Sequence, residues 1–282
     1  MKSPAEIASF VAEAAGHAPA IYGQAPWWFS AGDRELTVHA DTERQQRAVD
    51  PVARELTISC GAAVLTARLA LRYLGCQPQV QVLPDRPELV ARISWPAELK
   101  PASEFERGLF DQVALRRPPA GPFGRRPLPP ELMASLLTGA SHEHASLRPM
   151  ADDDERSALL AVADAASCAV QLRNARAAVT DPAGPAPDPE PPFLAEPPVA
   201  GETAQLKSAR VSAILSTSAD DRTAWIAAGQ ALQLVLLVAA SHGVQVAVDG
   251  TATEFPSLRD FLRTELVDGA YPQLVLAFGL PA

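Results

Sequence analysis

A short run of histidine and carboxylate side chains is the first place where this sequence could bind a metal. His142, Glu143 and His144 set two imidazoles two residues apart, with a carboxylate between them. A structural zinc site needs further ligands at a defined spacing, and this run offers no third ligand of that kind. A surface loop is therefore favoured over a metal site.

Motifs for nucleophilic or nucleotide chemistry are missing. Ser59 lies in Ser-Cys-Gly, without the Gly-x-Ser-x-Gly turn that exposes a nucleophilic serine. The sequence has neither a Walker A loop nor a Gly-x-Gly-x-x-Gly loop. Cys60, Cys76 and Cys168 are odd in number and far apart, so they indicate neither a disulfide framework nor a metal knuckle. Cys60 and Cys76 lie in an apolar helical stretch and are predicted to be buried structural thiols.

The composition is that of a globular protein. The chain has 282 residues, of which 48% are apolar and 20% charged, enough to bury a large core in one or two domains. Its net charge of -9 and its pI near 5.1 exclude a general attraction to nucleic acid or to an anionic membrane. Residues 1–16 have the pattern of an amphipathic helix and not of a signal peptide. The longest apolar run, residues 231–240, is too short to span a bilayer, so we expect a cytoplasmic protein.

The first part of the chain, residues 1–110, alternates helices and strands. Ser3-Pro4 opens a helix with a capping serine and a proline in the first turn. Asp50-Pro51 opens a second helix, whose apolar residues recur every three or four positions until Gly75 stops it. The remaining elements expected here are a polar-aromatic loop at 16–30 and strands at 35–40, 80–83 and 89–95.

The second part of the chain begins with a connector rich in proline and arginine, at 111–140. A helix is predicted from Asp153 to Arg176, with acidic residues 152–154 at its positive end. Residues 180–204 contain eight prolines and should form an extended or flexible loop. Strands are then expected at 209–216, 244–248 and 273–278, and helices at 222–242 and 256–266. Both parts thus combine helices with antiparallel strands, which suggests an internal duplication.

Three separated segments resemble the Acg-like branch of the nitroreductase superfamily. The longest is residues 39–63, where an aspartate, a basic and polar stretch, Asp-Pro, Arg-Glu-Leu and Ser-Cys-Gly-Ala-Ala follow one another in that branch's order. The second is Trp-Ile-Ala-Ala-Gly-Gln-Ala-Leu-Gln at 225–233. The third is the closing Pro-Gln strand at 269–279, which contains Gln273. The match covers residues 1–130 and 205–282.

The resemblance implies an α+β nitroreductase-like fold, with a central antiparallel sheet flanked by helices. Ordinary nitroreductases are homodimers that hold FMN at the subunit interface, whereas the Acg-like branch carries two fused half-units in one chain, an intramolecular pseudo-dimer. The halves here would be residues 1–110 and 111–282, in a monomeric protein. The implied chemistry is hydride transfer from NAD(P)H to FMN, and then to a nitro compound, quinone or similar acceptor.

The resemblance places the FMN phosphate at Arg116 and Arg117. The family meets this dianion with Arg-Arg-Ser/Thr-x-Arg, because guanidinium groups pair well with phosphate oxygens. Here the hydroxyl position is Pro118 and the last arginine position is Ala120. Relatives also commonly carry an arginine before the closing glycine, where this chain has Ala277. A solvated basic turn remains the alternative interpretation of the arginine pair.

A second family motif, Ala-Pro-Ser-x-His-Asn-x-Gln-Pro-Trp, shapes the pocket of the flavin ring. Its apolar frame is kept at Pro19 and Trp27. The serine, histidine, asparagine and glutamine positions hold other residues, namely Ala20, Tyr22, Gly23 and Ala25. Gln24 could replace the lost amide, one position away. For the aromatic residues 27–29, a core-anchoring cluster is favoured over ring stacking.

These losses predict weakened FMN binding. A charge-assisted contact to phosphate contributes roughly 1.5–3 kcal/mol, and about 1.4 kcal/mol is tenfold in affinity. Two functions stay open. The first is a nitroreductase-like, NAD(P)H-dependent FMN oxidoreductase, with flavin and nicotinamide as its partners. The second is a catalytically inactive paralogue that sequesters or senses flavin or acts through a protein partner.

Overall fold

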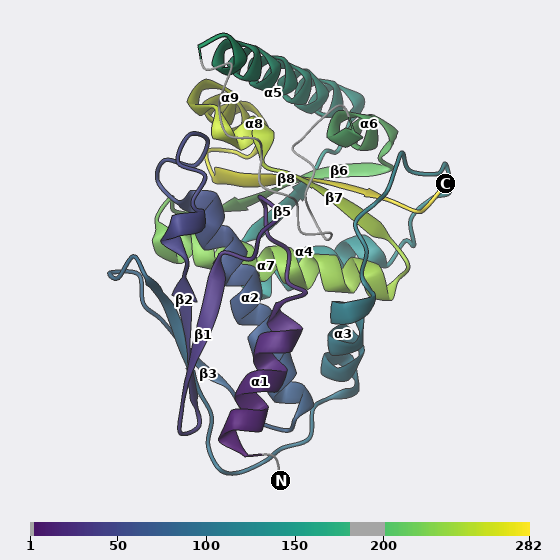
Figure 1. The fold of residues 1–282 in the computed structure, drawn as a ribbon. Helices are drawn as coiled ribbons and strands as arrows, with labels where there is room; N and C mark the ends of the chain where they lie inside the picture. Colours follow the sequence, from purple (N-terminus) through teal and green to yellow (C-terminus); the bar gives the residue numbers. More distant parts are fainter. Residues whose placement is uncertain (1–2, 181–200) are drawn as a thin grey trace.

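The computed structural model describes residues 3–180 and 201–282, except for the side chains of 177–180 and 201–203. Its architecture is α+β, with antiparallel sheets flanked by helices (Figure 1). The expected fold class is thus confirmed, although the strands form two four-stranded sheets and not one central sheet. Most of the proline-rich loop expected at 180–204 lies outside the described residues, and its last part, residues 201–204, is helical, so the prediction of a loop is wrong there.

The first sheet and its helices are built by residues 3–115. In chain order the elements are α1 (Pro4–Ala15), β1 (Trp27–Gly32), β2 (Glu35–Ala40), the 3-10 turn η1 (Thr42–Arg44), α2 (Arg54–Tyr73), β3 (Gln79–Val82), β4 (Leu89–Ser94) and α3 (Glu104–Leu115). α1 starts where the sequence predicts, with a capping box in which the Ser3 hydroxyl accepts from the Glu6 N–H and the Glu6 carboxylate from the Ser3 N–H.

The second sheet and its helices follow from residue 132 onward. The elements are α4 (Leu132–His142), β5 (Ser146–Pro149), α5 (Asp153–Thr180), α6 (Gly201–Ser208), β6 (Val211–Thr217), α7 (Arg222–Ser241), β7 (Gln245–Asp249), α8 (Thr251–Glu254), α9 (Pro256–Phe261), the π-helical turn η2 (Leu262–Leu266) and β8 (Tyr271–Gly279). The predicted strands and long helices of this part lie within a few residues of these bounds.

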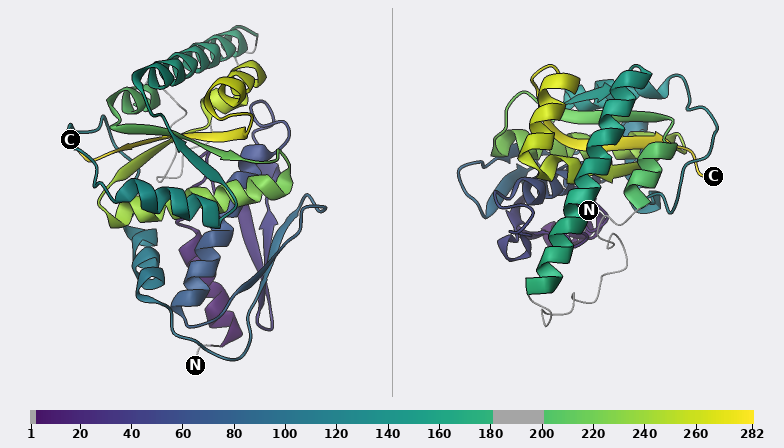
Figure 2. Two further views of the ribbon diagram at one scale, coloured as in Figure 1. Left: turned by 180° about the vertical axis from the view of Figure 1, so that it is seen from behind. Right: turned by 90° about the horizontal axis from the view of Figure 1, so that it is seen from above.

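The two sheets have the same strand order. The first runs β1-β2-β4-β3 and the second β5-β6-β8-β7, and every neighbouring pair is antiparallel. In each case a helix of 20 residues, α2 or α7, follows the second strand. The two sheets therefore share one strand order. Figure 2 shows the fold from behind and from above.

The helices α2 and α7 cross in close contact. A Cβ atom on Gly61 of α2 would collide with the backbone oxygen of Ile226, and one on Gly229 of α7 with that of Ile58. Glycine lets two helix backbones approach this closely because it has no Cβ. The crossing joins the two sheet-and-helix assemblies through their most buried helices.

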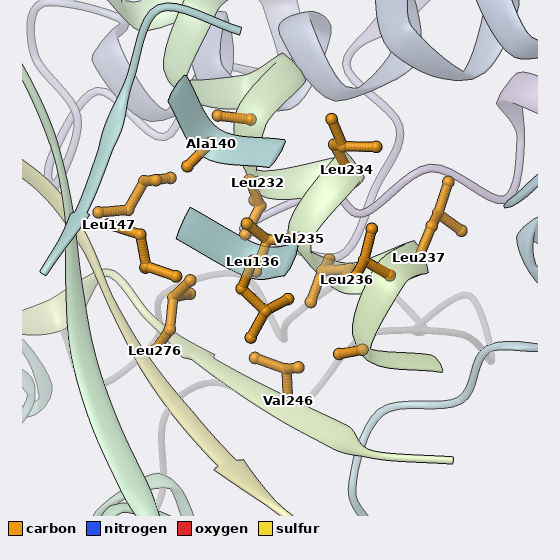
Figure 3. Packing of buried hydrophobic residues seen from close by; sticks show 14 of the residues in the cluster. Leu136, Ala140, Leu147, Leu232, Leu234, Val235, Leu236, Leu237, Val246 and Leu276 are labelled. Atoms are coloured by element: carbon orange, nitrogen blue, oxygen red, sulfur yellow. The ribbon is translucent and has the colours of Figure 1, made fainter. Parts of the chain in front are cut away.

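On its other side, α7 packs against α4 and the second sheet. Leu136, Leu232, Val235 and Leu276 meet in this core (Figure 3). Within the described residues, α7 alone is long and apolar enough to cross a membrane, yet 67% of its apolar window is buried in the fold. Its apolar composition is therefore that of a helix buried in the core of the fold.

Residues 27–32 form a strand, so the prediction of a loop over 16–30 is wrong in its last part. β1 pairs with β2 in antiparallel register, from Trp27 opposite Ala40 to Gly32 opposite Glu35. The aromatic residues at 27–29 favour strands, and the tight turn that follows is closed by Arg34 with a positive φ of 53°. Pairing with β2 stabilises this strand, although the polar and proline-containing residues before it favour a loop.

Candidate functional site

The structure divides the expected site residues between two regions. Arg116 and Arg117 line a cleft formed by α3, α7 and β7, which we call the Arg116 cleft. Tyr22 and Gln273 belong to a polar network around the first turn of α2. The residues expected to contact one flavin molecule are therefore not gathered in a single pocket.

The Arg116 cleft has a volume of about 240 Å³. Its lining residues are Gln112, Leu115, Arg116, Arg117, Leu236, Ala240, Gly243, Val244, Gln245, Val246 and Pro281. None of these described residues carries a carboxylate, so the two arginines supply all of the charge in the lining. The rest of the lining is mostly apolar, and a phosphate placed here would meet positive charge alone.

Arg116 is half-buried, and no described residue that lines the cleft brings a carboxylate to it. It is the residue that ends α3, and its Nε atom is buried with no hydrogen-bond partner among the described residues. Burial, together with the neighbouring charge of Arg117, lowers the pKa of Arg116 to about 10. Arg117 donates from Nη1 to the backbone oxygens of Ala114 and Arg116, at 2.6 and 2.9 Å. An anion would relieve the charge repulsion and satisfy the buried Nε–H.

At three positions where the family motif contacts the phosphate, this chain has side chains that cannot donate a hydrogen bond. Pro118 and Ala120 follow the arginines in the connector, and Ala120 is exposed. Ala277 is buried in β8, where it pairs with Ala247 of β7 and Ser212 of β6. The structure therefore leaves Arg116 and Arg117 as the cationic contribution of the family motif.

The residues expected around the flavin ring have different environments. Pro19 and Trp27 are buried, and Trp27 belongs to the core beneath the first sheet. Gln24 is exposed. Trp28 is 51% exposed and stacks on His39 with ring centroids 3.7 Å apart. The aromatic cluster expected to anchor the core is therefore divided, with Trp27 inside it and Trp28 on the surface.

Tyr22, at the family's histidine position, lies between two carboxylates. Its hydroxyl donates to Glu254 of α8 at 3.3 Å, and Glu254 also pairs with Arg173 of α5 at 3.0 Å. Burial, followed by the negative charges of Glu55 and Glu254, raises the pKa of the Tyr22 hydroxyl. The phenol is thus held neutral and can donate but not readily lose its proton.

Gln273 is fully buried at the centre of the polar network. Its side-chain nitrogen donates to the Thr217 hydroxyl at 2.8 Å, and its side-chain oxygen accepts from Arg54 and Arg259, each at 3.2 Å. Arg259 also binds both oxygens of Asp220 at 2.7 Å. Burial opposes ionisation, but the hydrogen bonds from Arg259 and its neighbours lower the pKa of Asp220 to about 2. Both polar side-chain atoms of Gln273 therefore form hydrogen bonds within the network.

The first turn of α2 brings buried charges to this network. Asp50 caps the helix, accepting from the N–H groups of Arg54 and Leu56 at 2.7 and 3.0 Å, while Ala53 has a left-handed φ of 60°. α2 thus begins at Arg54, after the Asp50-Pro51 start predicted from the sequence. Arg54 is 4% exposed, and it donates to the Gln273 backbone oxygen and to Glu55, at 2.7 and 2.6 Å.

One carboxylate oxygen of Glu55 accepts no hydrogen bond from the described residues. The residue is 1% exposed, and its Oε1 accepts from Arg54. Its Oε2 is buried and has no hydrogen-bond partner within residues 3–180 and 201–282. Burial raises the pKa of Glu55 to about 7, although Arg54 acts in the opposite direction.

The network forms the floor of a second cavity, of about 360 Å³, which we call the Glu55 cavity. It is lined by Val49, Asp50, Pro51, Val52, Arg54, Glu55, Asp220, Trp225, Thr253, Glu254, Pro256, Arg259, Asp260, Arg263, Tyr271 and Pro272. No lining residue is shared with the Arg116 cleft. Among the described residues, no group of three histidine, cysteine or acidic side chains is arranged to hold a metal ion.

Strand β7 connects the two regions. Gln245 and Val246, at its start, line the Arg116 cleft, and Gly250, just beyond its end, lies against the Glu55 carboxylate and Ile21. At about 3.3 Å per residue the strand spans roughly 16 Å. β7 is also the edge strand of its sheet, so the backbone groups on its outer side are not used in strand pairing.

The buried charges of the network were not predicted from the sequence. Arg54 and Glu55 were noted within the family-like Arg-Glu-Leu run, but without a role. Asp220, Glu254 and Arg259 lie in other segments and meet the network through tertiary folding. The sequence feature that could have indicated this network is the charged pair Arg54 and Glu55 at the start of an otherwise apolar helix. Charged residues are rarely buried unless they are paired.

Proteins of Mycobacterium tuberculosis are similar to this chain in sequence, whereas no family model matches it. The protein named "Putative NAD(P)H nitroreductase Rv3131" is 28% identical over 293 residues, which cover 98% of this chain and 85% of that protein. The protein named "Putative NAD(P)H nitroreductase acg" is 26% identical over 151 residues, which cover 52% of this chain and 45% of that protein.

Solved nitroreductase structures also match part of the chain. The FMN-dependent nitroreductase NfnB of Mycobacterium smegmatis, in complex with NADPH, has 16% identity and a TM-score of 0.44, covering 63% of this chain and 89% of its own. A Bacteroides fragilis nitroreductase with bound FMN has 13% identity and a TM-score of 0.43, covering 62% and 88%. Because these scores are low, the assignment depends on the sequence relatives. The motifs in the Acg order and the alignment to Rv3131 over almost the whole length support the resemblance of this chain to the Acg-like branch of the nitroreductase superfamily.

Proposed function

We propose that this protein is a nitroreductase-like flavoprotein that binds FMN weakly through the Arg116 cleft and accepts NAD(P)H as its hydride donor. FMN and NAD(P)H are suggested by the names of the similar proteins. When bound, FMN would supply the two-electron chemistry, and the protein would supply binding, orientation and shielding from water.

The observation that carries the proposal is the buried Nε atom of the half-buried Arg116, which has no hydrogen-bond partner among the described residues and lies in a cleft whose described lining has no carboxylate. A buried charge without a partner is costly, and proteins usually pair it. A phosphate group would pair with Arg116 and Arg117 together and would accept from the buried Nε–H. This fits the family's phosphate position, which the sequence places at the same two arginines.

The course of β7 supports an extended ligand. FMN is elongated, with its phosphate at one end and its ring at the other. A phosphate at Arg116 would direct the ring along β7 toward Tyr22, over a strand that spans roughly 16 Å. The open edge of β7 offers backbone groups to the polar edge of a ring, and Tyr22 lies near the far end as a neutral donor.

The same structure explains why binding would be weak. Pro118, Ala120 and Ala277 remove a hydroxyl and two guanidinium groups from the family's phosphate contacts. Each lost charge-assisted contact removes roughly 1.5–3 kcal/mol, so the two lost arginines alone would weaken binding by about a hundredfold or more. We also propose that residues 1–110 and 111–282 are two fused half-units of a cytoplasmic monomer. The shared strand order of the two sheets and the α2–α7 crossing support this pseudo-dimer.

A catalytically inactive, flavin-sequestering or flavin-sensing paralogue is the second candidate, and one feature favours it. Glu55 and Glu254 lie beside Tyr22, where the ring would end. Hydride addition brings negative charge to a flavin, and two nearby carboxylates oppose it. The two candidates share the phosphate site and differ in whether NAD(P)H reduces the bound flavin.

Titration with flavins tests the binding proposal. FMN fluorescence should be quenched by the purified protein with saturation, and riboflavin, which lacks the phosphate, should bind at least tenfold more weakly. The variant Arg116→Gln should lose the preference for FMN, whereas Arg126→Gln, an exposed arginine of the same connector, should retain it. Equal binding of FMN and riboflavin, or no quenching at high micromolar FMN, would contradict the proposal. Bleaching of bound FMN by NAD(P)H separates the oxidoreductase from the inactive paralogue.

A further inference from the structure

We propose that the Glu55 cavity binds a small organic cation with an apolar body, whose charged end sits against Glu55. The cavity shares no lining residue with the Arg116 cleft. The proposal therefore does not depend on flavin binding, and it adds a second ligand site of opposite charge preference.

The lining of the cavity has an excess of negative charge. Its acidic residues are Asp50, Glu55, Asp220, Glu254 and Asp260, and its basic residues are Arg54, Arg259 and Arg263. Five carboxylates against three guanidiniums leave two negative charges in excess. Arg173, which pairs with Glu254 from outside the lining, reduces the excess to one. A ligand with one positive charge would neutralise this region.

The arginines of the cavity are already engaged. Arg54 binds Glu55 and Gln273, and Arg259 binds Asp220. Arg263 lies over the ring of Tyr271, 4.2 Å from its centroid, and donates to a backbone oxygen. An anionic ligand would have to compete with these contacts, whereas a cation would not.

Glu55 gives the charged end of the ligand its partner. Its side chain is 2% exposed and lines the cavity, and its Oε2 atom is buried without a hydrogen-bond partner among the described residues. A buried carboxylate oxygen is strongly favoured to accept from a charged donor. An ammonium group of the ligand would supply that donor.

The walls of the cavity define the rest of the ligand. Val49, Pro51, Val52, Pro256 and Pro272 line it, together with the aromatic residues Trp225 and Tyr271. A volume of about 360 Å³ is at the lower end of small-molecule sites. These walls suit an apolar or aromatic body better than a hydrated ion. The described residues also lack a three-ligand cluster for a metal, which favours an organic cation over a metal ion.

Calorimetric titration of the full chain with phenethylammonium tests this site. At about pH 8, where phenethylamine is still protonated and Glu55 is ionised, we expect saturable binding at one site. The neutral analogue 2-phenylethanol, which has the same aromatic body, should bind at least tenfold more weakly. Equal binding of the two probes, or no saturable binding of the cation, would overturn the proposal.

Variants connect the binding to the cavity. Glu55→Gln keeps the shape of the side chain and should weaken phenethylammonium binding at least tenfold. Asp260→Asn, at an exposed position in the lining, should weaken it several-fold without loss of folding. Asp111→Asn, an exposed acid of α3 outside the cavity, serves as the matched control. If Glu55→Gln does not fold, unchanged affinity in Asp260→Asn would itself contradict the proposal.

Discussion

In the Glu55 cavity the buried Arg54 and the half-buried Arg259 each pair with a carboxylate, whereas the described lining of the Arg116 cleft offers none to the half-buried Arg116. Arg54 and Arg259 are bound to Glu55 and Asp220 at 2.6 and 2.7 Å. Arg116 has a buried Nε atom without a partner and a lowered pKa. The difference separates charges that are paired within the fold from a charge for which we propose an anionic ligand. Removing one partner of a buried ion pair destabilises the folded protein. An unpaired charge away from water destabilises it without any substitution.

The largest effect should come from removing Arg54. Arg54→Ala would leave Glu55 buried without its donor Arg54, and the carbonyl oxygen of Gln273 would keep only the longer hydrogen bond from the Thr253 hydroxyl among its side-chain donors. Breaking a buried pair from one side typically costs about 3–5 kcal/mol, which urea denaturation would detect as a lower free energy of unfolding. The control is Arg44→Ala. Arg44 pairs with Asp41 at the surface with 46% of its side chain exposed, and this loss should stay below about 1 kcal/mol. Equal losses in both variants would contradict the comparison.

The pH dependence of stability should show the burial of Glu55 next. Its pKa is about 7 in the folded protein, above the ordinary value of 4.5, so the folded state binds the proton more tightly than the unfolded state. The resulting stabilisation is complete below about pH 4.5 and is lost as the pH rises through 7, and it amounts to roughly 3 kcal/mol. Glu254 and Asp249, whose pKa values burial also raises, act in the same direction.

Two carboxylates with lowered pKa values make the folded protein less stable at low pH. The pKa of Glu106 is lowered to about 2, first by its hydrogen bond from Arg72, and that of Asp220 also lies at about 2. Their stabilisation is lost as the pH falls from about 4 toward 2. The melting temperature should therefore peak in mildly acidic buffer, and Glu55→Gln should flatten its decline between about pH 5 and 8. A decline of unchanged steepness in this variant would show that Glu55 is not the group responsible.

The sequence predicted the elements better than it predicted which charges meet. α2 and α7 follow from apolar periodicity, and the capping serine of α1 fixes its start at Pro4. β1 was missed because its pairing partner decides its conformation. The network around Gln273 could not be inferred, since Arg54, Asp220 and Arg259 are far apart in the sequence and the Arg-Glu-Leu run that contains Arg54 indicates no partner for it. Arg116 was named as a site residue from the family motif, but its unpaired burial is a property of the folded chain.

Restoring a cation should strengthen the Arg116 cleft. Ala120→Arg returns the last arginine of the family motif at an exposed position, where the larger side chain has room. One charge-assisted contact contributes roughly 1.5–3 kcal/mol, so FMN should bind about ten- to a hundredfold more tightly, with riboflavin unchanged. The control Ala97→Arg adds the same charge at an exposed position of another loop. If both variants tighten FMN binding equally, the gain is a general effect of net charge and not of the cleft.

The smallest effect on stability, and the sharpest contrast with Arg54, should follow from Arg116→Gln. This change removes a half-buried charge that no carboxylate in the described lining compensates. In buffer without multivalent anions, the free energy of unfolding should therefore stay unchanged or rise by up to about 1 kcal/mol. Inorganic phosphate should raise the melting temperature of the unmodified protein, because it binds the folded state alone, and should not do so in the variant. The exposed Arg126→Gln should keep the response to phosphate. A loss of stability as large as that of Arg54→Ala would mean that Arg116 has a structural partner, and the distinction between the two regions would fail.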